Sequence, residues 1–317
     1  MRTVLSCSMS TQSSAIVSNP TVLSGRSGLW WGLLGVAAFS FTVPFTRVIV
    51  AGGAMSPLFV GSGRAVVAAI LAAGALALAR QSFPTRRQWA RLGIVAGGVV
   101  LGFPLLTSFA LTSAPAIHSV VVIALLPAAT AVMSVLRTRE RPSTAFWVAA
   151  VVGALAAVTF ALIEGGGLGS LHWADLLLFG AVIVCAIGYA EGGLLSRELG
   201  AWQTISWALV LASPVMIALA AIASVQQPPS GTLIEWTAFA YLGIVSMFLG
   251  FFAWYRGLAI GPMAQVSQIQ LTQPVLSIAW AALILGEQIT WVTIIGGVAV
   301  IACALLAVRA RVKGNRS

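Results

Sequence analysis

Amide and hydroxyl side chains are concentrated at residues 265–277, inside a stretch that is otherwise apolar. At helical spacing, one face would carry Gln265, Gln268 and Thr272. A second face would carry Gln270, Gln273 and Ser277. Amides donate and accept hydrogen bonds, so either face could form the wall of a binding site for a polar substrate. The alternative is that these side chains join neighbouring helices, a contact that contributes about 1 kcal/mol.

The same stretch repeats an earlier part of the chain. Residues 115–127 read PAIHSVVVIALLP and residues 262–274 read PMAQVSQIQLTQP, so their first prolines are 147 residues apart (262 − 115 = 147). This offset places His118 opposite Gln265, which favours a substrate-binding role for both; a structural histidine is the alternative. Pro127 and Pro274 also correspond. They could be hinges that flank a cavity, or static kinks.

Three ionisable residues, Arg47, Arg64 and Glu191, lie within or near apolar stretches, where charge is costly and often functional. Arg47 lies about one turn from a predicted helix end, so its side chain can reach the interface. Arg64 lies deeper, and could attract a substrate carboxylate, pair with an acid or extend to the outer interface. Glu191 is a candidate for proton coupling, because burial disfavours its charged form. It could instead bind a substrate amine or reach the cytoplasm.

Four aromatic residues lie far enough inside the predicted helices to contact a bound molecule: Tyr189, Trp207, Trp254 and Tyr255. Their rings could stack on an apolar or cationic substrate. Tryptophans nearer the helix ends are expected to anchor the helices at the membrane interfaces.

Membrane-spanning helices must position these residues. The chain has 317 residues, of which 59% are hydrophobic and only 8% charged, whereas a soluble domain carries about 25% charged residues. We predict an all-α integral membrane protein with ten spans of about 20 residues. Five lie in each half, near 29–50, 56–79, 90–111, 117–136, 144–163, 174–195, 203–224, 236–255, 264–285 and 289–308.

The net charge of +10 does not indicate a nucleic-acid partner, because the basic residues lie at alternate helix ends. They are Arg80, Arg86, Arg87, Arg91, Arg137, Arg139, Arg141, Arg197, Arg256, Arg309, Arg311, Lys313 and Arg316. Basic loops stay in the cytoplasm, which predicts two cytoplasmic termini. Five spans per half is an odd number, so the second half is expected to be inverted relative to the first.

The halves resemble the EamA-type repeats of the drug/metabolite transporter superfamily. The resemblance rests on an alanine–leucine pair in each half (Ala110-Leu111, Leu258-Ala259), on Pro127 and Pro274, and on an acidic turn before the last helix of each half (Glu140, Glu287). It is closest over residues 273–306, QPVLSIAWAALILGEQITWVTIIGGVAVIACALL, and covers about 29–308. The first half lacks the Leu-Gly pair that precedes Glu287. The resemblance implies ten helices, inverted repeats, a central cavity and export of amino acids or other small metabolites.

The predicted organisation has four parts. Residues 1–28 form a disordered cytoplasmic tail, 29–163 and 174–308 form the two repeats, and 309–317 form a basic cytoplasmic tail. Three cysteines without paired spacing suggest neither a disulfide framework nor a metal site, and no cofactor is expected.

The sequence therefore predicts a secondary transporter in the bacterial inner membrane, functional as a monomer among lipids. It would export small amphipathic metabolites, driven by protons or by the substrate's own gradient. A multidrug or cation efflux carrier is one alternative. An intramembrane enzyme is another, but it would need clustered His, Asp or Glu, and the chain has two histidines and no known hydrolase motif.

Overall fold

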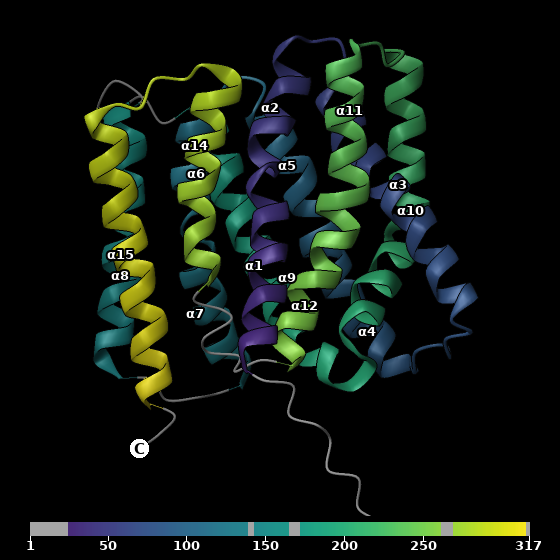
Figure 1. Cartoon of the computed structure of the whole chain (residues 1–317), viewed down its shortest axis with the longest axis horizontal. Coiled ribbons are helices and arrows are strands. Elements are labelled where there is room, and N and C mark those ends of the chain that lie inside the picture. Colours follow the sequence, from purple (N-terminus) through teal and green to yellow (C-terminus); the bar gives the residue numbers. More distant parts are fainter. Residues whose placement is uncertain (1–24, 139–142, 165–171, 261–268, 315–317) are drawn as a thin grey trace, which may run out of the picture.

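A computed structural model of the chain describes residues 25–138, 143–164, 172–260 and 269–314. Every element within these ranges is helical, and the helices form one upright bundle (Figure 1). The first half contains α1 (Gly25–Ser40), α2 (Thr42–Ala51), α3 (Pro57–Leu78), α4 (Arg86–Val95), η1 (Ala96–Gly102), α5 (Phe103–Ala110), α6 (Ala116–Ile123), α7 (Leu126–Thr138) and α8 (Thr144–Glu164). The second contains α9 (Trp173–Leu199), α10 (Ala201–Gln226), α11 (Leu233–Tyr241), η2 (Leu242–Leu249), α12 (Gly250–Ile260), η3 (Gln270–Thr272), α14 (Gln273–Leu285) and α15 (Trp291–Gly314).

Within the described residues, seven helical stretches are long and apolar enough to cross a membrane: Ser27–Ala51, Pro57–Leu78, Arg86–Ala110, Ala116–Arg137, Trp173–Leu199, Ala201–Gln226 and Leu233–Gly257. Shorter apolar helices occupy the places of the fifth, ninth and tenth predicted spans: Thr144–Phe160, Gln270–Leu285 and Trp291–Leu306. The all-helical membrane class is confirmed, and the count of ten full spans stays a prediction.

Two local features recur at the offset of 147 residues. Thr85 and Thr232 (85 + 147 = 232) each cap a helix, and the side chain three residues later accepts a hydrogen bond from the capping residue's backbone N–H, at 2.8 Å for Gln88 and 2.7 Å for Glu235. Such reciprocal bonds satisfy N–H groups that have no partner within the helix. Each capped helix then widens into a π-helical segment, η1 in the first half and η2 in the second. Figure 1 shows α4 toward the lower end of the bundle and α11 toward the upper end.

Three helices are interrupted near prolines. Phe41 separates α1 from α2, residues 124–125 separate α6 from α7, and η3 precedes α14. Pro44, Pro127 and Pro274 follow these interruptions within three residues. Proline has no N–H to donate to the carbonyl four residues earlier and clashes with it, which explains why the helices break there.

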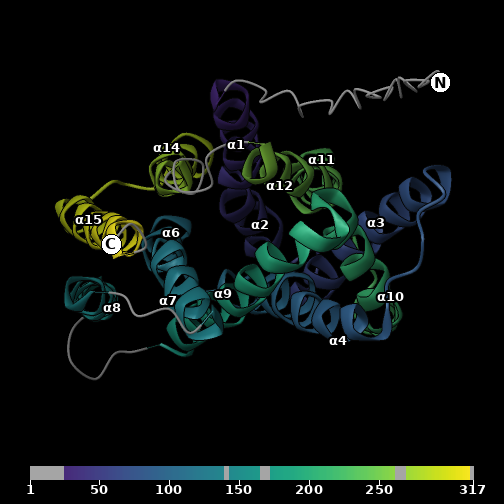
Figure 2. The same cartoon turned by 90° about the horizontal axis from the view of Figure 1, so that it is seen from below.

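Helices of the two halves pack against one another throughout the bundle. α1 lies along α12, α3 along α10, α8 along α15, and α7 along α9. Seen from below (Figure 2), α8 and α15 form one edge, while α3, α4 and α10 form the opposite side. Close approach of η1 to α9 depends on Gly98, since a Cβ there would lie 2.2 Å from the Val184 carbonyl oxygen. The two halves therefore form a single packed body.

Candidate functional site

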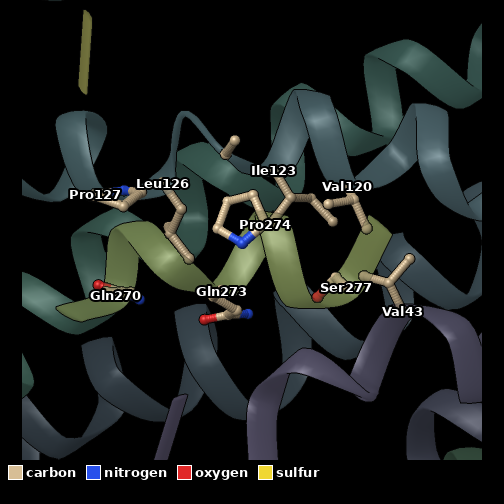
Figure 3. Close-up of a pocket in the computed structure, with 10 residues that line it drawn as sticks. Val43, Val120, Ile123, Leu126, Pro127, Gln270, Gln273, Pro274 and Ser277 are labelled. Carbon is tan, nitrogen blue, oxygen red and sulfur yellow. The ribbon is translucent and has the colours of Figure 1, made fainter. Parts of the chain in front are cut away.

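A cavity lies between α2, the break from α6 to α7, and the η3–α14 segment (Figure 3). Its empty space is about 330 Å³, including space open to solvent. The part that a water-sized sphere can occupy is only about 20 Å³, room for about one water molecule, so a small-molecule substrate would need a wider cavity than this conformation shows. The first half contributes Val43, Val120, Ile123, Ala124, Leu126 and Pro127. The second half contributes Gln270, Gln273, Pro274 and Ser277.

Facing walls of the cavity are built from equivalent positions. The offset of 147 residues pairs Ile123 with Gln270, Leu126 with Gln273 and Pro127 with Pro274, and all six residues line the cavity. The first-half wall is apolar, whereas the second-half wall presents two amides and a hydroxyl. A molecule with one apolar and one polar side would match this asymmetry.

Helix breaks on both walls shape the site. The prolines predicted as hinges lie in the cavity lining, and Figure 3 shows them on the two segments that face each other. Irregular backbone at membrane depth is tolerated where it lines a cavity or is buried in protein. Whether these prolines act as hinges stays a prediction.

The α1–α2 break connects to the same site through Ser277. Pro44 cannot donate to the carbonyl of Ser40, and the Ser277 hydroxyl donates to that oxygen instead, at 2.7 Å. Trp280 Nε1 donates to Ser40 Oγ at 3.0 Å, and its ring stacks on Phe41 with centroids 4.5 Å apart. Sequence reasoning missed Val43, Phe41 and Trp280. Pro44, inside a predicted span, is the signal that could have pointed to this region.

The predicted glutamine wall is divided between described and undescribed residues. Gln265 and Gln268, the favoured pair, lie outside the described residues, so their role stays a prediction. Gln270, Gln273 and Ser277, the second face, line the cavity. Thr272, from the first face, is exposed.

Two of the predicted aromatic contacts lie away from the cavity. Trp207 packs between Phe83 and Trp89, with ring centroids 5.3 and 5.5 Å away. Trp254 packs against α1, where a Cβ at Gly35 would lie 2.8–2.9 Å from its backbone and Cβ atoms. Neither residue lines the cavity in this structure, because both side chains are buried by packing between helices.

Tyr189 and Tyr255 flank Phe251, at centroid distances of 6.0 and 5.8 Å. Neither lines the cavity, although Tyr189 packs against the cluster that contains the cavity residue Leu126. The Tyr255 hydroxyl is buried and has no hydrogen-bond partner within the described residues. Substrate contact by the four predicted aromatic residues would require a different arrangement of the helices.

Arg64 is buried on α3, outside the cavity lining. Its guanidinium group lies between Thr46 of α2 and Thr107 of α5, and each hydroxyl oxygen is 3.4 Å away. The expectation that this side chain reaches the outer interface is wrong, since only 2% of the residue is exposed.

His118 is paired with an acid rather than placed in the cavity. Its Nε2 atom lies 2.6 Å from Asp175 Oδ1 on α9, and both residues are buried. The cavity residues Val120 and Ile123 lie on a different face of α6 from His118. The pair joins the two halves of the chain near the start of α9.

Glu191 is held by arginines of the other half. Its carboxylate pairs with Arg91 of α4 and with Arg137 of α7, whose Nε–Oε2 distance is 2.6 Å; Arg91 also pairs with Glu198. Two guanidinium groups favour the ionised carboxylate. The expectation that Glu191 extends freely into the cytoplasm is wrong, because its side chain is 3% exposed. Its coupling role stays a prediction that would require these pairs to open.

Glu287 closes the bundle at the end opposite the Glu191 pairs. Its two carboxylate oxygens accept hydrogen bonds from the backbone N–H groups of Ala116 and Ile117, both at 2.7 Å. A carboxylate at a helix N-terminus compensates both the unpaired donors and the helix dipole. Glu140, its predicted counterpart, lies outside the described residues.

The arrangement of side chains at the cavity is suited to polar binding. Among the described residues, no group of three or more His, Cys, Asp or Glu side chains is placed to hold a metal ion. The chemistry that remains is hydrogen bonding by the amides, burial of apolar groups, and charge contacts between the halves.

Comparisons with known proteins agree with a two-repeat architecture. The sequence matches the model of the EamA-like transporter family over residues 26–162 and again over 172–309. It is 44% identical over 281 residues to "Uncharacterized transporter YdeK" of Bacillus subtilis (strain 168), covering 88% of this chain and 96% of that protein. A solved structure described only as "Crystal structure of protein" is similar with a TM-score of 0.61 and 20% identity, over 92% of this chain and 99% of the other. That likeness shows the fold.

Proposed function

We propose that this chain, which belongs to the EamA-like transporter family, is a secondary transporter that exports small amphipathic metabolites across the bacterial inner membrane by alternating access. Its family and its transporter relative make it a multi-pass membrane transporter. The cargo that we propose is amino acids or related compounds. The observation that carries this proposal is the cavity between two broken helices, one from each half.

Contacts between the halves at both ends of the bundle support alternating access. At one end, Arg91 and Arg137 of the first half pair with Glu191 of the second. At the other end, Glu287 of the second half holds the start of α6. A transporter of this class must open each end in turn. Equivalent helices that point to opposite ends, such as α4 and α11, support the inverted arrangement that this requires (Figure 1).

The cavity lining favours an amphipathic substrate without a net positive charge. Gln270, Gln273 and Ser277 would bind its polar groups, and Ile123 and Leu126 would contact its apolar part. Gln265 and Gln268 remain in the proposal from sequence alone. A cation carrier would be expected to present a carboxylate, and the described lining contains none.

The proposed orientation places both termini in the cytoplasm. Arg91 of α4 and Arg137 of α7 meet at Glu191 near the end of α9, and basic segments remain on the cytoplasmic side. The Glu287 turn would then face outward. The chain would act as a monomer, with a small molecule, lipids and, as a coupling candidate, protons as its partners.

Counterflow into proteoliposomes tests this proposal. Labelled amino acids and the drug cation ethidium are screened with wild-type protein, and then with Gln270→Leu and Gln273→Leu. Loss of amide contacts in the cavity should lower transport of an accepted compound roughly tenfold, since a buried hydrogen bond to a charged group contributes 1.5–3 kcal/mol. Gln288→Leu is the matched control, because Gln288 is exposed in the α14–α15 turn.

The outcomes separate the candidates. Transport of amino acids that the two cavity variants impair and the control does not would support the proposal. Transport of ethidium alone would favour the cation carrier instead. Full activity of both cavity variants would place the substrate elsewhere, and a wild-type protein that moves no compound with or without a pH gradient would contradict the transport function.

A further inference from the structure

Arg64 holds a buried positive charge without an acidic partner among the described residues. The residue is 2% exposed. Its Nη1 and Nη2 atoms reach the hydroxyl oxygens of Thr46 and Thr107 only at 3.4 Å, and its Nε atom is buried with no hydrogen-bond partner. A guanidinium group has five N–H donors, so most of its hydrogen-bonding capacity is unused here.

Neither threonine compensates the charge. Thr46 donates its hydroxyl proton to the Thr42 carbonyl at 2.7 Å, and Thr107 donates to the Phe103 carbonyl at 2.6 Å. Each therefore presents only neutral lone pairs to Arg64. An ion removed from water is stabilised in a protein by an opposite charge together with good hydrogen bonds, and the two hydroxyls supply neither.

Two other arginines of the spanning helices, Arg91 and Arg47, have closer partners. Arg91 pairs with two carboxylates. Arg47 donates from Nη1 to the carbonyl oxygens of Leu111 and Thr112, at 2.6 and 2.9 Å, which satisfies the end of α5. Within the described residues Arg64 therefore has only two distant neutral partners, and a buried charge left in this way points to a partner from outside the chain.

Arg64 is connected to the cavity wall by helix α2. Its partner Thr46 is three residues from Val43, which lines the cavity, and positions three apart share one face of a helix. Thr46 and Val43 are separated by about 4.5 Å along the axis of α2. Under the 147-residue offset Arg64 corresponds to Leu211 (64 + 147 = 211). The positive charge is therefore present in the first repeat and absent at the equivalent position of the second.

We propose that Arg64 binds the carboxylate of the transported substrate when the cavity extends along α2. This inference rests on the proposed transport function and specifies its cargo as an amphipathic carboxylate. The guanidinium fork can donate hydrogen bonds to both carboxylate oxygens. The amides of Gln270 and Gln273 take the other polar groups, and the first-half wall takes the apolar part.

An unusual combination of effects follows. Replacing a residue that stabilises the fold lowers the stability of the protein. Removing a buried charge that has no compensating partner raises it. Arg64→Met should therefore unfold at a higher temperature than wild type in detergent and should lose selection for carboxylates. Arg47→Met is the matched control: it should unfold at a lower temperature, because two carbonyls lose their donor, and should keep that selection.

The experiment compares each labelled amino acid with its C-terminal amide. Counterflow is measured in liposomes of neutral phosphatidylcholine, so that no lipid carboxylate competes. Wild type should move the acid at least tenfold faster than the amide, as expected for a lost charged hydrogen bond. Arg64→Met should remove that preference, and Arg64→Lys, which keeps the charge without the fork, should retain part of it.

Three outcomes overturn the assignment. Equal transport of acids and amides by wild type would exclude a carboxylate site. A preference for acids that survives in Arg64→Met would place the site elsewhere. A lower unfolding temperature of Arg64→Met would assign Arg64 to the fold. Transport of no compound by wild type would instead contradict the transport function itself.

Discussion

Glu191 illustrates how a residue's surroundings change its expected chemistry. From the sequence it is a carboxylate inside an apolar stretch, which suggests a proton site. In the structure Arg91 and Arg137 neutralise it, and both arginines come from the other half of the chain. Buried pairs of this kind are costly to break by removing one partner. Glu191 therefore suits a contact that closes one end of the bundle.

Replacement of Glu191 by Gln tests that role. The variant leaves two arginines without a partner at the closed end, so the end should open more readily. We expect faster labelling of a cysteine introduced at Ser134, on α7 one turn before Arg137, and a loss of gradient-driven accumulation. Glu198→Gln is the control, because Glu198 pairs with Arg91 but its side chain is half exposed. Unchanged accumulation across a pH series would exclude both the closing role and the proton-coupling role.

Residue types were readable from the sequence, but their partners were not. The spacing of the glutamines identified both faces of the cluster. It does not specify how the helix is rotated relative to its neighbours. It could not tell that Gln270 and Gln273 face the cavity. The His118–Asp175 pair joins residues 57 positions apart, and the sequence gives no local signal for it. The four aromatic residues lie outside the cavity lining in this structure, because depth in the membrane does not distinguish helix packing from exposure to a cavity.

At the scale of elements, the two ends of α6 are defined in different ways. Its N-terminus is capped by Glu287 from the other half, and its C-terminus stops at the break before Pro127. One of its faces lines the cavity and another carries His118.

Glu287→Ala should weaken this cap. Two N–H groups at the start of α6 would lose their acceptor together with a favourable charge at the helix N-terminus. We expect a loss of about 1 kcal/mol or more in stability, as measured for capping side chains. Thermal unfolding of the purified protein in detergent measures it. Gln288→Ala, at the exposed neighbouring position, should unfold like wild type, and an unchanged transition in Glu287→Ala would show that the cap contributes nothing.

The positions of helices followed from hydropathy, whereas their irregularities did not. Seven described stretches coincide with predicted spans. The π-helical segments η1 and η2 were not predicted, because both lie in runs of apolar residues that are equally compatible with a regular α-helix. The breaks near Pro127 and Pro274 were anticipated, since proline removes a specific hydrogen bond. The break at Phe41 was missed, although Pro44 supplies the same physical cause.

For the whole molecule, the internal repeat was the most informative signal. The offset read from two prolines also relates the capping residues Thr85 and Thr232 and the facing pairs of the cavity wall. A cavity built by equivalent positions lies where two halves meet, which explains why its residues are far apart in the chain. The asymmetry of its walls arises from side chains that differ between the repeats, such as Ile123 and Gln270.

Access to the cavity from both sides of the membrane is the central claim. It is tested with a single cysteine at Gln273 in a chain whose own three cysteines are replaced. Membrane-impermeant maleimide is applied to right-side-out and to inside-out vesicles. Cysteines at Arg139 and Gln288 serve as sidedness controls, because these turns are expected on opposite sides. Alternating access predicts that the cysteine at position 273 is labelled from either side, whereas each control is labelled from one side only. Labelling of position 273 from one side alone, while transport persists, would contradict the account.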